Sequence, residues 1–395
     1  MILKQDGSVW STPICLRGCG PTRGVNRYFI QVIASGAIAV TAGNYYSLVL
    51  KQDGSVWTKG RNYQGQLGDG TRVKKDTFRA ISMVPDTKAI SAGGGHSMVL
   101  TQEGHVFSAG SNNYGQLGGV LASYTTKFTQ VMSASAQAVS AGSSHTIVLH
   151  RDGSVLAAGR NDYGQLGDGT KEDRSTFVRV VSNGAVAVSA GGSHTMVLKQ
   201  DGSVWTTGCN ESGQLGDGTI TERLNYVEVI LSETKAIAAG RQHSLILKQD
   251  DSVWATGYNA YGQLGDRSSI SRQYFVQVIS GGAKIIAAGA FHSMVLAQDG
   301  SIWAAGSNEH GQFGDGTTKS SKSFFRISPL YYGAAREMIV FIWIACTNVL
   351  CSQLISTHAT VELGSVTTRV ADIIVAATVT KDVKDDAGKA LASIM

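Results

Sequence analysis

The sequence predicts an all-β protein built as a ring of seven four-stranded blades, and three observations lead to this prediction. A motif of about 49 residues recurs along the chain, with a Gly-Gln pair in one register in six copies. Each copy contains short apolar runs separated by turn residues. No copy contains a stretch of about ten residues in which apolar residues recur with a helical period, as a leucine-rich or helical solenoid requires. Repeats of this length with four strands each are typical of β-propellers.

The repeat frame is defined by three residue types that stay in step. The Gly-Gln pairs begin at Gly65, Gly115, Gly164, Gly213, Gly262 and Gly311. A His recurs at His96, His145, His194, His243 and His292. Tyr46 takes the His position in the earliest complete copy, and the hairpin motif that ends at Trp57 also occurs at residues 3–10. Counting by this hairpin gives seven copies, and therefore seven blades.

Each copy contains four expected strands, as the one around His194 illustrates. The small-residue run 186–190 predicts the innermost strand, and the apolar run 193–198 predicts the second. The β-type residues 204–206 resume after a turn and predict the third strand. A further run of the type seen at 177–181 follows each Gly-Gln-Leu-Gly turn and predicts the outermost strand.

The turn of the central hairpin carries an Asp-Gly pair in most copies, as at Asp201-Gly202, which predicts a two-residue hairpin loop. Asp250-Asp251 breaks this pattern. Because Asp adopts left-handed backbone angles at a higher cost than Gly, we expect the turn at Asp251 to be slightly strained.

The chain divides by its match to the repeat. Residues 1–35 are a degenerate partial blade, 36–329 are six regular repeats, 330–351 are the expected ring-closing segment and 352–395 are a tail without the motif. The chain begins within a blade, so the first blade lacks its innermost strand. Met338 to Ala345 lies one repeat length beyond His292 and is the expected replacement, which would cover two open sheet edges.

Composition and charge exclude several classes of protein. The chain has 34 basic and 29 acidic residues but no Lys/Arg runs, so nucleic acid or chromatin is not expected as a direct ligand. The five Cys residues are irregularly spaced, which favours a reducing, intracellular setting, cytoplasmic or nuclear. The N-terminal residues lack a signal-peptide pattern, and the longest apolar run is too short to span a bilayer. We expect a monomer with no membrane contact.

The periodic residues predict structure rather than chemistry. One His per blade is spread around a ring and does not converge on one metal ion, so we expect these His residues to bond backbone or a neighbouring blade. Packing between blades is expected for the recurring Trp residues, Trp57, Trp205, Trp254 and Trp303. The Gly-Gln-Leu-Gly turns lack the Lys-Ser/Thr of a phosphate loop, and no Asp recurs with the Ser residues that follow some of the His residues, such as Ser97 and Ser244. We therefore expect no cofactor, no metal and no enzymatic activity.

A pair of residues varies between the constant Ala-Gly and His-Ser segments of each repeat. The pairs are Asn44-Tyr45, Gly94-Gly95, Ser143-Ser144, Gly192-Ser193, Arg241-Gln242 and Ala290-Phe291. These positions are expected in turns on one rim of the ring, where loops on a rigid scaffold usually carry function. Tyr45, Arg241 and Phe291 are the expected partner-binding anchors, with Asn44 and Gln242 beside them. Drift at unconstrained surface sites is the alternative explanation.

The strings Gly159 to Asp168 and Ala190 to Thr195 resemble the regulator of chromosome condensation repeat family. The resemblance implies a seven-bladed propeller and three known roles: guanine nucleotide exchange on the small GTPase Ran, partner binding in large ubiquitin ligases, and light sensing in a plant photoreceptor. The variable pairs contain no Trp, which argues against light sensing. The leading interpretation is a scaffold that binds a protein partner through its rim loops, and the alternative is a guanine nucleotide exchange factor or regulator for a small GTPase.

Overall fold

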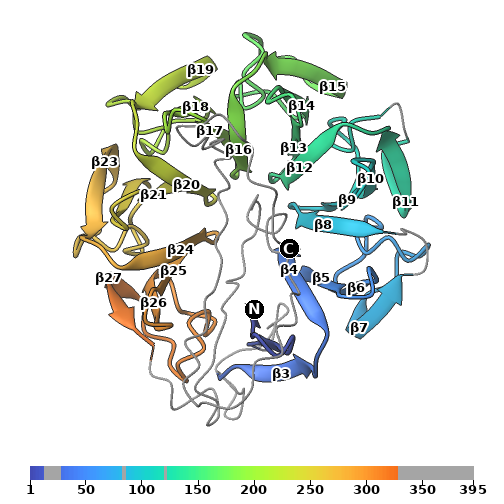
Figure 1. The fold of residues 1–395 in the computed structure, drawn as a ribbon, viewed down its shortest axis with the longest axis horizontal. Coiled ribbons are helices and arrows are strands. Elements are labelled where there is room, and N and C mark those ends of the chain that lie inside the picture. The colour runs from blue at the N-terminus through green and yellow to red at the C-terminus, as the bar shows by residue number, and fades with distance from the viewer. Residues whose placement is uncertain (13–27, 82–85, 120–121, 328–395) are drawn as a thin grey trace, which may run out of the picture.

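The chain forms a ring of seven β-sheets arranged as blades around a central axis (Figure 1). The computed structural model describes residues 1–12, 28–81, 86–119 and 122–327. Six blades have four strands, and the first has three within the described residues. These residues contain no helix, and so none that could cross a membrane. The predicted all-β, seven-bladed propeller is confirmed.

The strands follow one another in chain order within every blade. Blade 1 contains β1 (Ile2–Leu3), β2 (Val9–Ser11) and β3 (Ile30–Ile33), and blade 2 contains β4 (Ala37–Gly43), β5 (Tyr46–Lys51), β6 (Val56–Gly60) and β7 (Lys75–Ile81). Blade 3 contains β8 (Thr87–Ala92), β9 (His96–Thr101), β10 (Val106–Ser111) and β11 (Tyr124–Met132), and blade 4 contains β12 (Ala136–Ala141), β13 (His145–His150), β14 (Val155–Gly159) and β15 (Arg174–Val181). Blade 5 contains β16 (Ala185–Ala190), β17 (His194–Lys199), β18 (Val204–Gly208) and β19 (Arg223–Ile230), and blade 6 contains β20 (Thr234–Ala239), β21 (His243–Lys248), β22 (Val253–Gly257) and β23 (Arg272–Ile279). Blade 7 contains β24 (Ala283–Ala288), β25 (His292–Ala297), β26 (Ile302–Gly306) and β27 (Ser321–Arg326).

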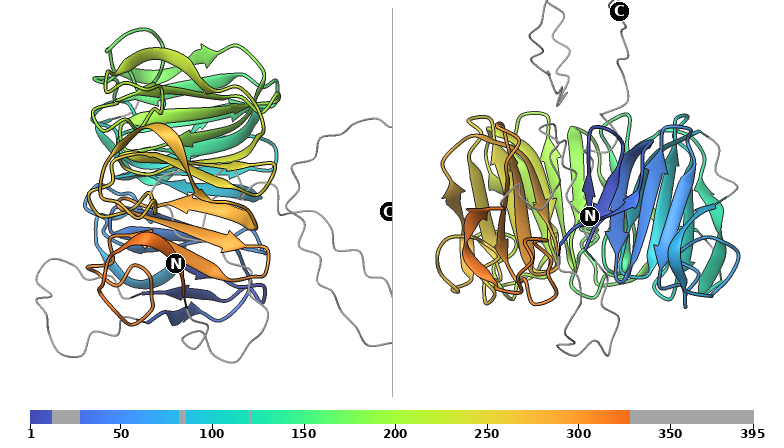
Figure 2. Two further views of the ribbon diagram at one scale, coloured as in Figure 1. Left: turned by 90° about the vertical axis from the view of Figure 1, so that its left-hand side faces the viewer. Right: turned by 90° about the horizontal axis from the view of Figure 1, so that it is seen from below.

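The strands run between the two faces of the ring (Figure 2). Neighbouring strands of a blade are antiparallel, so successive loops open on opposite faces. In blade 5, Ala190 pairs with Thr195, and Val197 pairs with Trp205. The innermost strands are rich in Ala and Ser, and from β4 to β24 each contacts the innermost strand of the neighbouring blade in the chain. Small side chains suit this position because the strands crowd together near the axis.

The central hairpins have three-residue loops, not the two-residue loops that the sequence predicted. In blade 5 the Lys199 amide donates to the Ser203 carbonyl at 2.9 Å, which leaves three residues in the loop. Gly202 has a φ of 82°, and the Ser203 amide donates to the Asp201 carboxylate at 2.9 Å. The Asp is therefore placed to accept a hydrogen bond, and the Gly to take the left-handed position. In blade 6 that position belongs to Asp251, with a φ of 65°, as expected.

Hydrophobic side chains fill the space between neighbouring blades. Between blades 4 and 5, for example, Ile147 and Leu149 pack with Val188 and Val197, and Trp205 covers the edge of the cluster. Every pair of neighbouring blades has such a cluster, and burial of apolar area is the main favourable term in assembling the ring.

The first and last blades meet through described residues. Ile2 and Phe29 of the N-terminal segment pack with Met294 and Phe313 of blade 7. Tyr28 forms an antiparallel bridge with Asp315, in the manner in which Asp217 bridges to Tyr274 between blades 5 and 6. The ring is therefore closed by the same contact that joins its regular blades. The predicted closing strand at Met338 to Ala345, with all of segments 330–351 and 352–395, lies outside the described residues.

Candidate functional site

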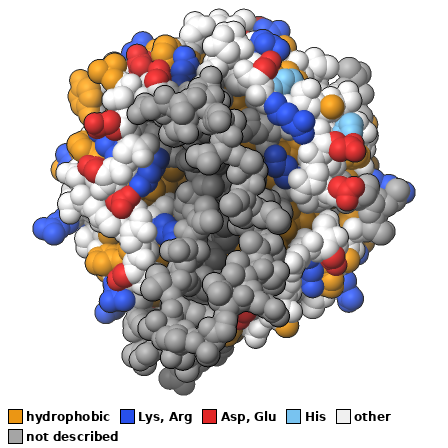
Figure 3. Space-filling model, viewed as in Figure 1, with side chains coloured by type: hydrophobic (Ala, Val, Ile, Leu, Met, Phe, Trp, Pro, Cys, Tyr) orange, Lys and Arg blue, Asp and Glu red, His pale blue; other side chains and the backbone are white. Residues whose placement is uncertain are grey.

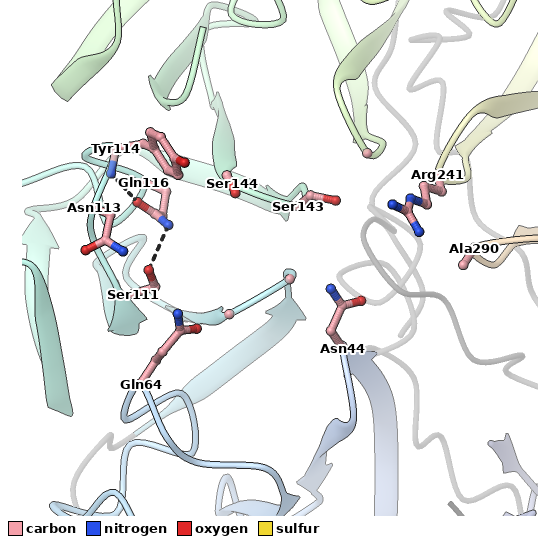
Figure 4. A pocket seen from close by; sticks show the side chains of 13 residues that line it. Asn44, Gln64, Ser111, Asn113, Tyr114, Gln116, Ser143, Ser144, Arg241 and Ala290 are labelled. Carbon is pink, nitrogen blue, oxygen red and sulfur yellow. Dashed lines mark hydrogen bonds between the residues drawn. The ribbon is translucent and has the colours of Figure 1, made fainter. Parts of the chain in front are cut away.

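In blades 2 to 7, the loops that join the first and second strands meet around the central axis on one face. Each of these six loops contributes to the lining of a cavity of about 470 Å³ at this place, through Asn44, Gly94, Ser143, Gly192, Arg241 and Ala290 (Figure 4). The loops between third and fourth strands open on the same face, because the strands alternate in direction. They contribute Gln64, Asn113 and Tyr114 to the lining. We call this face, with both sets of loops, the rim.

Buried His residues hold the rim loops in place through hydrogen bonds to the next blade. His194 begins β17 directly after its loop, and its Nε2 lies 2.9 Å from the Ser244 hydroxyl of the next blade. That hydroxyl donates its only hydrogen to the Gln214 carbonyl at 2.7 Å, so His194 must be the donor, through Nε2–H. The same arrangement joins His96 to Thr146, His145 to Thr195 and His243 to Ser293. In blade 2, Tyr46 replaces the His and donates to the His96 carbonyl.

Complete burial keeps these His residues neutral. Burial lowers the pKa of His96, His194 and His292 to about 4, and that of His145 and His243 to about 3. In four of them, all but His292, Nδ1 is buried and has no hydrogen-bond partner among the described residues. Protonation at Nδ1 would therefore place an uncompensated charge inside the ring. In the described part of the chain, no three His, Cys, Asp or Glu side chains are grouped so as to hold a metal ion.

Two of the variable pairs are constrained by packing. A Cβ at Gly94 would lie 2.4 Å from the Ser143 carbonyl oxygen of the next blade. A Cβ at Gly192 would lie 2.3 Å from the Arg241 carbonyl oxygen. Both distances are far below contact, so glycine is required here by the close approach of neighbouring loops. Neither surface drift nor partner binding explains these two residues.

Arg241 and Phe291 come together with two tyrosines that the sequence interpretation missed. The Arg241 guanidinium lies 5.4 Å from the centroid of the Phe291 ring. Phe291 in turn lies 5.1 Å from Tyr261 and 6.3 Å from Tyr258, between ring centroids. We call these four residues the aromatic shelf. Tyr258 stands where other repeats have Arg, Ser or Cys, and this departure from the repeat was the available signal.

Tyr45 forms a second exposed group on the rim. Its φ of 68° is unusual for a bulky residue, and 47% of its surface is exposed. The Arg61 guanidinium lies 4.4 Å from the Tyr45 ring centroid and 5.8 Å from that of Tyr63. We call these three residues the Tyr45 cluster. No contact joins it to the aromatic shelf among the described residues.

A family match covers residues 87–356, described as the RCC1-like domain. Regulator of chromosome condensation (RCC1) repeats match at 53–100 and 37–66. This chain belongs to the RCC1-like domain family. The resemblance drawn from the repeat motif is therefore confirmed. No curated protein matches the chain.

Solved structures share the fold of this RCC1-like domain. Prp20p from Saccharomyces cerevisiae, described with its binding to Gsp1p and histones, is 23% identical with a TM-score of 0.67, over 74% of this chain and 77% of Prp20p. Human WBSCR16 is 22% identical with a TM-score of 0.70, over 81% of this chain and 89% of that one. Identities this low establish the fold alone.

The other residues predicted from the sequence of this RCC1-like domain lie partly at the cavity and partly near the opposite face. Asn44 and Arg241 line the cavity, whereas Gln242 is half-buried and accepts a hydrogen bond from the Tyr258 amide at 2.8 Å through its carbonyl. The Trp residues lie near the opposite face, beside the central hairpins. Trp205 donates to the Ser203 hydroxyl at 3.1 Å, and the Lys199 ammonium lies 3.9 Å from its ring centroid. Similar contacts hold Trp57 and Trp254, and Trp303 bonds Ser301.

Proposed function

We propose that this RCC1-like domain is an interaction scaffold that docks a protein partner on its rim. The main observation is that exposed and half-buried aromatic and Arg side chains, the aromatic shelf and the Tyr45 cluster, lie on the same face as a central cavity. Trp, Tyr and Arg dominate the binding energy of protein interfaces, and loops on a rigid scaffold hold them at low entropic cost. Nucleic-acid binding, which needs a broad basic surface, is not favoured, because basic and acidic side chains are interspersed over the face in Figure 3.

The bonding of the His residues supports a role other than catalysis. A nucleophilic Ser must donate its proton to the His that activates it. Here Ser244 donates to the Gln214 carbonyl and accepts from His194, and both side chains are fully buried. The recurring His and hydroxyl pairs therefore stabilise the contacts between blades and have no substrate access.

A binding assay with a triple variant tests the proposal. Tyr45→Ala, Arg241→Ala and Phe291→Ala together are expected to weaken partner binding at least about 100-fold, since each hot-spot truncation costs about 2 kcal/mol or more. The matched control is Arg179→Ala, Val186→Ala and Leu231→Ala, three exposed residues that lie off the rim. Unchanged binding by a rim variant with a normal melting temperature would contradict docking at this face.

A small GTPase is the second candidate partner, and the fold shared with Prp20p, which is described as binding Gsp1p, is what favours it. If the domain acts as an exchange factor, catalytic amounts should accelerate release of a fluorescent guanine nucleotide from one member of a panel of small GTPases. The rim triple variant should lose that acceleration, and the control triple variant should keep it. Absence of acceleration across the panel would leave the scaffold as the function.

A further inference from the structure

The cavity at the centre of the rim has an unusual balance of polar groups. Its lining includes the side-chain amides of Asn44, Gln64 and Asn113 and the hydroxyls of Ser143 and Ser144. Arg241 is the one cation of this lining, and no Asp or Glu from the described residues belongs to it. A volume of about 470 Å³ is within the range of about 300–1,000 Å³ typical of ligand sites. The cavity therefore offers hydrogen bonds and one positive charge.

Arg241 is held in a position suited to binding an anion. Its guanidinium lies 5.4 Å from the centroid of the Phe291 ring, which also contacts Tyr258 and Tyr261. A cation–π contact uses the charge of the guanidinium and leaves N–H groups available to bond a carboxylate. None of the ion pairs found among the described residues involves Arg241. In Figure 4 the side chains of Arg241, Asn44 and Ser143 point toward one common space.

One carboxylate matches this site better than a phosphate does. An Arg forms two parallel N–H···O bonds with a carboxylate, and a single cation balances its single charge. A phosphate group carries about −1.5 to −2 charges and has three acceptor oxygens, so it would remain partly unbalanced beside one Arg. The amides of Asn44, Gln64 and Asn113 can both donate and accept, which suits the backbone of a peptide.

We propose that the cavity receives an acidic segment of the protein partner, with an Asp or Glu carboxylate paired to Arg241. The surrounding amides bond the backbone of that segment, and the aromatic shelf packs against its neighbouring apolar residues. This inference rests on the proposed function, because it assigns the chemistry of the partner that docks on the rim.

Selection from a random peptide library displayed on phage, using the intact chain as bait, tests the assignment. Enriched peptides should share an Asp or Glu at one position. A synthetic version of the best peptide and its Asn or Gln counterpart are then measured by fluorescence polarisation against the wild type, Arg241→Ala and Arg241→Lys. We expect the acidic peptide to bind the wild type about tenfold or more tightly than its amide counterpart. Arg241→Ala should remove this difference, and Arg241→Lys should restore part of it.

The outcomes separate the inference from the function on which it rests. If peptides bind but the wild type does not distinguish the acidic from the amide form, the carboxylate assignment is overturned. Rim docking would still stand if Tyr45→Ala and Phe291→Ala weakened the same peptides. Insensitivity to all three rim substitutions would overturn both. A phosphoserine counterpart that binds more tightly than the acidic peptide would replace the carboxylate by a phosphate.

Discussion

Acidification from pH 7 to pH 4 is expected to destabilise the ring by several kcal/mol, before most carboxylates are protonated. The five buried His residues have pKa values of about 3 to 4 in the folded chain, against 6.5 for ordinary His. Between these values the unfolded chain binds protons that the folded chain does not, so the free energy of unfolding falls with pH. The full stability is retained above about pH 6.5. Each tenfold difference in proton affinity contributes about 1.4 kcal/mol, which is large against a total stability of about 5–15 kcal/mol.

Urea unfolding midpoints measured from pH 7 to pH 4.5 check this expectation. The matched control replaces His194 and His243 by Tyr, because Tyr46 already occupies this position in blade 2, opposite Ser97. The double variant should keep its fold at pH 7 and lose stability less steeply on acidification. The Asp carboxylates of the central hairpins titrate at lower pH than this range. In Asp201, for example, hydrogen bonds from the Ser203 hydroxyl and amide reduce the pKa below the ordinary value of 3.8. A midpoint that does not change down to pH 4.5 would contradict the account of the His residues.

Substitution of Gly213 by Ala is expected to cost about 4 kcal/mol or more, whereas the same change at Gly300 should cost about 1–2 kcal/mol. Both residues have a φ of 79°, so the backbone strain is the same. At Gly213, the Gly of the repeated Gly-Gln pair, a Cβ would lie 2.4 Å from the Arg272 carbonyl oxygen and 2.7 Å from the Gln273 Cα in blade 6. At Gly300 a Cβ meets no heavy atom within 4 Å.

The difference between these two variants measures the inter-blade contact alone. Thermal unfolding of Gly213→Ala, Gly300→Ala and the wild type should place Gly300→Ala close to the wild type and Gly213→Ala well below both. Equal melting temperatures of the two variants would mean that the blades are not held as closely as described.

The parts of the fold that repeat were predictable, because each repeated residue has one physical task. The Gly of the Gly-Gln pair recurs since a neighbouring backbone lies against it, and the His recurs since it bonds the next blade. Such constraints keep the register visible in a single sequence. The contact of Tyr28 with Asp315 was missed, although residues 28–33 (YFIQVI) closely match residues 274–279 (YFVQVI) of blade 6, where Tyr274 makes the equivalent bridge to Asp217.

The candidate site was predictable only in part, since its residues depend on neighbours from other blades. Tyr45, Arg241 and Phe291 stood out by residue type and by their variable position. The requirement for Gly192 came from the carbonyl of the following blade, and the support of Phe291 came from Tyr258 and Tyr261, about thirty residues earlier in the chain. Neither of these contacts can be predicted from the sequence of a single repeat.

Site-specific photo-crosslinking measures most directly where a partner docks. A photoreactive phenylalanine analogue is placed at Tyr63, on the rim, or at Leu231, which follows β19 on the opposite face; these residues are 59% and 80% exposed. The control position is the more exposed of the two, so weaker crosslinking from it cannot be due to burial. We expect one protein partner, identified by mass spectrometry, to be crosslinked from Tyr63 and not from Leu231. Crosslinking of that partner from Leu231 alone, or equally from both positions, would contradict docking on the rim.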